Sequence, residues 1–141
     1  MALRIKSQWH DEGAQRSLAE TAGAIAFNGW RLALDRAINL SGEQFLYETN
    51  EQRLAVIAEY VIFEIQAVDR MVHDKLQASE RQTLITTLAL RLADHMEGNS
   101  RDLLGAGDHR EAFIERLNLR MDKDGPEVYK QLKRIVRNLI N

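Results

Sequence analysis

LAVIAEYVIFEIQAVDRMVHDKL, from Leu54 to Leu76, is the stretch of sequence that decides the fold. Its apolar residues recur at helical spacing almost all the way round, which is typical of a helix enclosed by other helices. The same stretch carries six polar or charged side chains, which are Glu59, Glu64, Gln66, Asp69, Arg70 and His73. Because an unpaired charge in a protein core is costly, these side chains need partners there. The stretch therefore predicts a helical bundle that contains buried polar residues.

Both sides of this helix are apolar. With about 100° per residue, one face carries Leu54, Ala58, Val61, Ile65, Val68, Val72 and Leu76, and the other carries Val56, Tyr60, Phe63, Ala67 and Met71. Two apolar sides need more cover than four neighbouring helices of modest length supply, and a symmetric partner would supply the rest. The pattern therefore predicts a homodimer.

The whole chain, residues 1–141, is expected to be all-α: a single-domain bundle of about five helices with Leu54–Leu76 as its central helix. The chain has a single proline and no strand-like alternation. The first helix is predicted over about residues 11–39 and is rich in small residues, with Gly23 and Gly29 inside it. Glycine costs about 1 kcal/mol relative to alanine there, and close approach of another helix is the usual compensation. We expect tight packing within the bundle, and a dimer interface on this helix is the alternative.

Capping signals set the limits of the next two helices. Asn50 is the expected N-cap of the central helix. Ser79 and Gln82 form a capping box that begins the third helix. Gly98 has the position of a C′ glycine, so we expect the third helix to end there and a loop to follow as far as Gly107.

The last two helices are predicted from similar signals. Asp108 and Glu111 form a second capping box, and Pro126 stands at the first position of a fifth helix. The apolar face of this fifth helix consists of Val128, Leu132, Ile135, Val136 and Leu139. Its basic face consists of Lys130, Lys133, Arg134 and Arg137. We favour a solvated basic face, and docking to phosphates or to an acidic partner is the alternative.

The composition of the chain limits the classes of protein to which it can belong. The chain is 45% hydrophobic and 28% charged, which is a soluble globular composition, and its net charge of −2 argues against nucleic acid as a partner. It has no cysteine, so it forms no disulfide and binds no metal through thiolates. Its first residues lack the apolar region of a signal peptide, and no apolar run reaches the roughly 18 residues of a membrane span. We expect a cytoplasmic protein without a membrane partner.

A metal- or small-ligand-binding bundle is the alternative function. The candidate ligands are Glu59, Glu64, Asp69, His73 and His95. Asp69 and His73 are four residues apart on a helix and can share a metal, although the Glu-x-x-His motif of carboxylate metal bundles is absent. We favour a structural interpretation, in which Glu59 pairs with Arg70 and Asp69 with His73, or these groups are neutralised by arginines such as Arg31, Arg36 or Arg91. No catalytic residue, metal or cofactor is assigned.

The stretch Asp94–Arg120, DHMEGNSRDLLGAGDHREAFIERLNLR, resembles the C-terminal pattern of the ubiquinol–cytochrome c assembly chaperones. In that family a helix ends in acidic residues, a glycine-rich turn ending in Gly-x-Gly-Asp follows, and another helix comes next. The similarity covers less than a quarter of the chain and lacks the family's closing Tyr-Gly element, so no residue role is carried over. The function expected from the whole sequence is a non-catalytic, adaptor- or chaperone-like helical protein that acts through protein–protein contacts, as a homodimer.

Overall fold

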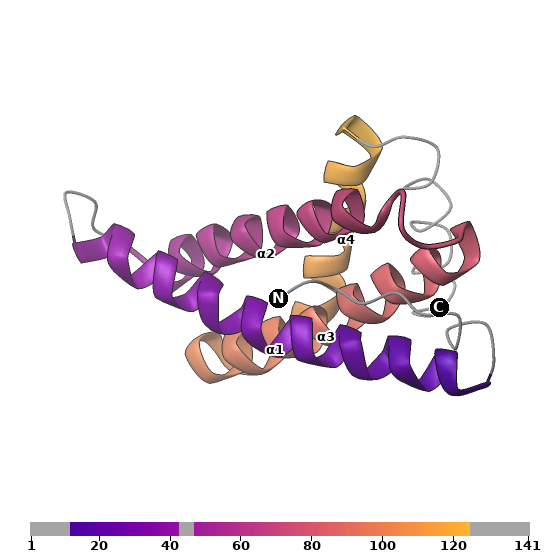
Figure 1. Cartoon of the computed structure of the whole chain (residues 1–141). Helices are drawn as coiled ribbons and strands as arrows, with labels where there is room; N and C mark the ends of the chain where they lie inside the picture. Colours follow the sequence, from indigo (N-terminus) through magenta and orange to yellow (C-terminus); the bar gives the residue numbers. More distant parts are fainter. Residues whose placement is uncertain (1–11, 43–46, 125–141) are drawn as a thin grey trace.

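The computed structural model describes residues 12–42 and 47–124 (Figure 1). These residues form four α-helices and no strand, which confirms the all-helical prediction for this part of the chain. The helices are α1 (Glu12–Gly42), α2 (Asn50–Val72), α3 (Ala78–Leu104) and α4 (His109–Asp124). The fifth helix expected from Pro126 lies outside the described residues.

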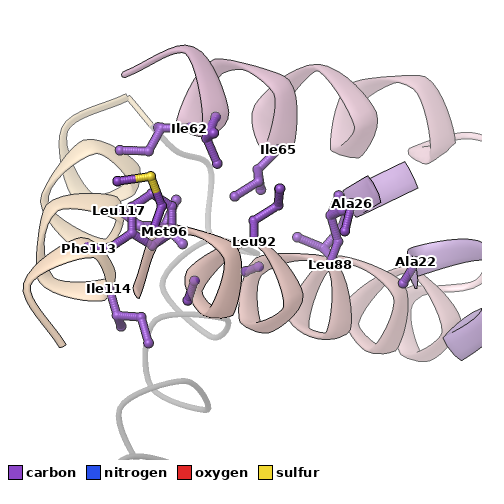
Figure 2. Packing of buried hydrophobic residues seen from close by; sticks show 14 of the residues in the cluster. Ala22, Ala26, Ile62, Ile65, Leu88, Leu92, Met96, Phe113, Ile114 and Leu117 are labelled. Carbon is purple, nitrogen blue, oxygen red and sulfur yellow. The ribbon is translucent and has the colours of Figure 1, made fainter. Parts of the chain in front are cut away.

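Helices α1, α2 and α4 pack around α3, which contacts each of them (Figure 1). The core lies where α2, α3 and α4 meet and continues along α1 (Figure 2). Its side chains include Ile62 and Ile65 from α2, Leu88, Leu92 and Met96 from α3, and Phe113, Ile114 and Leu117 from α4. Burial of large apolar side chains stabilises such a fold by about 1.5–3 kcal/mol each. No helix in the described part of the chain is long and apolar enough to cross a membrane.

Small residues bring α1 close to its neighbours, as predicted. Among residues 17–39, the buried side chains of α1 are those of Leu18, Ala22, Ala26, Ala33 and Ala37. Alanine adds little bulk beyond the backbone, so α2 and α3 approach this helix closely. Gly29 has the same role, because a Cβ atom there would lie 3.3 Å from Oε1 of Glu64 on α2. At Gly23 a Cβ atom would meet no atom within 4 Å, so the close approach predicted there is not found among the described residues.

Two helix boundaries differ from the predictions at their N-terminal ends. The N-cap of α2 is Thr49 in place of Asn50, and its Oγ1 accepts a hydrogen bond of 3.0 Å from the backbone N–H of Gln52. The N-cap of α3 is Gln77, whose backbone N–H donates to Oε1 of Glu80 at 3.2 Å. A capping box therefore begins α3, but it lies two residues before the one predicted from Ser79.

The predicted end of the third helix is wrong. Helix α3 continues through Gly98 to Leu104, so residues 98–104 are helical and only a short turn precedes α4. Met96 and Ser100 are both buried, and this packing holds the last turns of the helix. The left-handed backbone falls at Gly105, with φ of 87°, and its N–H donates to the carbonyl of Arg101 at 2.8 Å. Gly105 is thus the residue that ends α3.

The described residues cover only one side of helix α2. Its buried side chains are those of Leu54, Ile57, Ala58, Val61, Ile62, Ile65, Asp69 and Val72. On the opposite side Phe63 is 64% exposed and Met71 is 67% exposed. The expectation that this helix is surrounded is therefore not met by the four described helices, and its outer side lies open.

Candidate functional site

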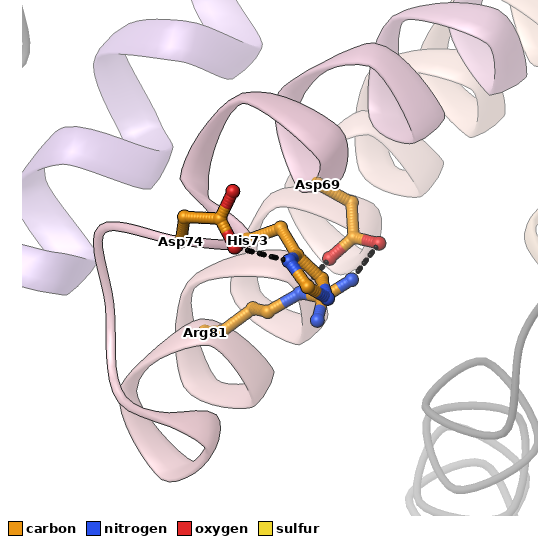
Figure 3. Close-up of polar contacts among 4 residues, drawn as sticks. All are labelled: Asp69, His73, Asp74 and Arg81. Atoms are coloured by element: carbon orange, nitrogen blue, oxygen red, sulfur yellow. Dashed lines mark hydrogen bonds and ion pairs between the residues drawn. The ribbon is translucent and has the colours of Figure 1, made fainter.

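The polar side chains of α2 were predicted to need partners, and Asp69 has one from α3. Nε of Arg81 donates to Oδ1 of Asp69, and Nη2 donates to Oδ2, both at 2.6 Å (Figure 3). The Asp69 side chain is only 3% exposed and the Arg81 side chain only 10%. Two parallel hydrogen bonds between a guanidinium and a carboxylate form a strong, geometrically specific pair. This ion pair joins the end of α2 to the first turns of α3.

The predicted pairing of Asp69 with His73 is wrong. Helix α2 ends at Val72, so His73 lies at its C-cap and its side chain is exposed. Its Nδ1 atom lies 2.9 Å from Oδ1 of the neighbouring Asp74 (Figure 3). Because Asp69 points into the bundle and bonds Arg81, the two side chains share no site.

The predicted pairing of Glu59 with Arg70 is also wrong. The carboxylate of Glu59 accepts hydrogen bonds from Arg120 of α4, one of them from Nε at 3.3 Å. A second arginine of α4, Arg116, donates from Nη1 to the backbone carbonyl of Ala55 at 3.2 Å. These contacts hold α4 against the first half of α2.

Glu64 lies between α2 and α1, over the Gly29 position. Its Oε1 atom is buried and has no hydrogen-bond partner among the described residues. Burial disfavours the charged carboxylate and raises the pKa of Glu64 to about 7. This side chain is therefore close to half protonated at neutral pH, and its charge responds to small changes in pH.

The five candidate metal ligands do not gather. His95 on α3 stacks against Trp30 of α1, with ring centroids 5.5 Å apart and planes 14° from parallel. The other four lie against α4, α1 and α3 and in solvent, as described above. Within residues 12–42 and 47–124, no group of three or more His, Asp or Glu side chains could hold a metal ion. The geometry of these residues therefore gives the metal-binding alternative no support.

The outer side of α2 carries an apolar row that consists of Val56, Tyr60, Phe63, Ala67 and Met71. The spacings of four, three, four and four residues place them along one side of the helix, as in a seam that packs on another helix. Val56, Tyr60 and Ala67 are half-buried, whereas Phe63 and Met71 project into solvent. We call these five residues the outer row.

A groove runs between α2 and α4 beside the first half of the outer row. It has a volume of about 1160 Å³ and is lined by Gln52, Ala55, Val56, Glu59, Tyr60, Phe63, Ala112, Glu115, Arg116, Leu119 and Arg120. Its lining is more apolar than polar and includes the charged side chains of Glu59, Glu115, Arg116 and Arg120. Leu119 is 66% exposed in it. Leu119 was not among the predicted functional residues; the signal for it in the sequence is its spacing of seven residues from Ala112 on the same side of α4.

No protein-family model, curated protein or solved structure matches this chain. The resemblance of residues 94–120 to the ubiquinol–cytochrome c assembly chaperones thus has no matching family model behind it, and it assigns no residue. The outer row and the groove are the two surface features of the described residues that bear on function.

Proposed function

We propose that this chain is a non-catalytic helical protein that acts through protein–protein contacts and forms a homodimer through the outer row of α2. The observation that carries the proposal is the exposure of Met71, at 67%, and of Phe63, at 64%, on a helix whose other side is fully packed. Large apolar side chains that line up along one exposed helix face are typical of an interface.

A two-fold axis makes such a row self-complementary. In an isologous dimer each copy covers the same row on its partner, so every buried side chain contributes twice. Full burial of one large apolar side chain is worth about 1.5–3 kcal/mol. Part of this gain offsets the entropy lost on association, so we expect a dimer of moderate affinity rather than an obligate one.

A charge placed on the outer row tests the proposal. The variant Met71→Glu puts a carboxylate at the end of the outer row, on its most exposed side chain, where the apolar surface of the second copy would have to cover it. We expect this variant to be monomeric at concentrations at which the parent chain is dimeric, with unchanged helix content. Sedimentation velocity measures the mass, and circular dichroism measures the helix content.

A matched control uses the other long helix. Ile38 on α1 is also 67% exposed, so Ile38→Glu adds the same charge at an equally exposed apolar position. It should leave the dimer intact. A dimer that is lost with Ile38→Glu and kept with Met71→Glu would move the interface to α1, the other helix predicted for it, and would contradict the assignment to α2.

The other functional expectations stay predictions from composition. They are a cytoplasmic location, an adaptor- or chaperone-like role toward a further protein, and no partnership with nucleic acid or membrane. No observation among the described residues favours a second function over protein–protein contact.

A further inference from the structure

Glu64 lies at the edge of the outer row. With about 100° per residue, it is about 20° around α2 from Met71 and about 40° from Tyr60. The apolar side of a helix that packs on a neighbour is about 100° wide, so a second copy that covers Met71 and Tyr60 also covers the position of Glu64. The side chain of Glu64 is half-buried within one chain, so part of its surface is left for the second copy to cover.

The carboxyl group of Glu64 has no compensating partner among the described residues. Its Oε1 atom is buried against the Gly29 position of α1 and accepts no hydrogen bond there. Burial, rather than a neighbouring charge, raises the pKa of this carboxyl group to about 7. The charged form is therefore already disfavoured within one chain, and further loss of water around the group disfavours it more.

Three other titratable groups lie on the helices around Glu64. Tyr60 precedes it by one turn on α2, and Arg36 lies on the Gly29 side of α1, two turns further along that helix. On α3, His95 packs against α1. None of the three donates a hydrogen bond to the buried Oε1 atom. Histidine ordinarily changes charge near neutral pH, so a test must separate Glu64 from His95.

We infer that Glu64 couples the homodimer to pH: each copy takes up a proton at this carboxyl group when the other copy covers the outer row. The inference rests on the proposed function, because the second copy is what covers Glu64. A carboxylate enclosed by apolar surface without a partner is costly, whereas the protonated carboxyl group is much less so. Under two-fold symmetry two such groups are covered in each dimer.

Cover by the second copy determines the direction of the pH effect. It raises the pKa of Glu64 in the dimer above the value of about 7 that the group has in the single chain. The dimer therefore binds more protons than two separate chains, and its association constant falls as the pH rises above about 7. Two carboxyl groups lower the association constant by up to about 100-fold per pH unit in this range. At lower pH the group is protonated in both forms, and its effect on association is constant.

Sedimentation equilibrium of the full chain at about pH 6 and about pH 8.5 tests the inference. We expect the dissociation constant of the parent dimer to rise about tenfold or more between the two pH values. In Glu64→Gln, which cannot ionise, it should change less than about twofold. The matched control Glu20→Gln removes a carboxyl group from an exposed position on α1 and should keep the pH dependence of the parent. Circular dichroism at both pH values checks that each variant is folded.

The possible outcomes separate the pH coupling from the homodimer itself. A parent chain that dimerises with the same dissociation constant at both pH values would overturn the coupling and leave the homodimer in place. A pH dependence that remains in Glu64→Gln would assign it to another group, such as His95, and would also overturn the coupling. Loss of the dependence in Glu20→Gln would do the same, because it would point to net charge. A chain that is monomeric at both pH values would contradict the proposed function, and the coupling with it.

Discussion

At the scale of single residues, the sequence predicted that the charges of α2 need partners but not which partners they have. Asp69 is buried and bonds Arg81, which lies on the next helix and twelve residues along the chain. The predicted partner, His73, was chosen from spacing along one helix, and that helix ends at Val72. Spacing within a helix cannot reveal a partner on a neighbouring helix, because that contact depends on how the helices pack.

The pair of Asp69 and Arg81 should be strongly coupled. Substitution Asp69→Ala leaves a buried guanidinium without its carboxylate, and we expect a loss of about 3–5 kcal/mol in the free energy of unfolding. Replacing both residues, as in Asp69→Leu with Arg81→Met, should recover most of this loss because no buried charge is left behind. Urea unfolding of the parent and both variants measures the difference. A loss below about 1 kcal/mol for Asp69→Ala, as for a surface pair, would contradict a buried ion pair.

Glu64 should make stability depend on pH in the range below neutrality. Burial raises the pKa of Glu64 to about 7 in the folded chain, so the unfolded chain releases this proton at a lower pH. The contribution of protonated Glu64 is fully present below its unfolded pKa and is lost as the pH rises to about 7.

The variant Glu64→Gln isolates this contribution. At pH 8 it should be more stable than the parent by about 1–2 kcal/mol, a value reduced for partial solvent access, and near pH 4 the two should be alike. Urea unfolding at both pH values measures the difference. A parent that is more stable than the variant at pH 8 would show that the carboxylate has a favourable partner in the folded chain.

At the scale of elements, helix existence followed from periodicity, while helix ends depended on tertiary contacts. The apolar periodicity of residues 54–76 and 84–96 predicted α2 and α3, and both helices are present. The glycine at position 98 was interpreted as a helix end, but burial of Met96 and Ser100 keeps the helix continuous as far as Leu104. The sequence alone therefore cannot distinguish a glycine that ends a helix from a glycine inside one, because the difference depends on the packing around it.

Alanine substitutions should distinguish these two kinds of glycine. At Gly98 an added Cβ meets no atom within 4 Å, so Gly98→Ala should stabilise the chain by about 0.5–1 kcal/mol through helix propensity. At Gly105 the backbone φ of 87° disfavours any side chain, so Gly105→Ala should destabilise it by about 1 kcal/mol. Thermal unfolding of the two variants measures both effects. A destabilising Gly98→Ala would support the original prediction that α3 ends there.

At the scale of the whole molecule, the sequence predicted that α2 has more apolar surface than the other helices cover. It did not predict where on the helix the uncovered surface lies. Phe63 and Met71 are exposed on the side opposite the buried face, as a surplus requires. The groove beside them could not be predicted, because it arises from the crossing of α2 and α4 and from the contacts of Arg116 and Arg120 that hold the two helices. A second copy of the chain is the neighbour proposed to cover this apolar surface.

The mass of the unmodified chain in solution tests the central claim most directly. Sedimentation equilibrium across low to high micromolar concentrations should show a monomer of 16.2 kDa that associates reversibly to twice that mass. A single species with the mass of one chain over the whole range would contradict the homodimer, and with it the function proposed for the outer row of α2.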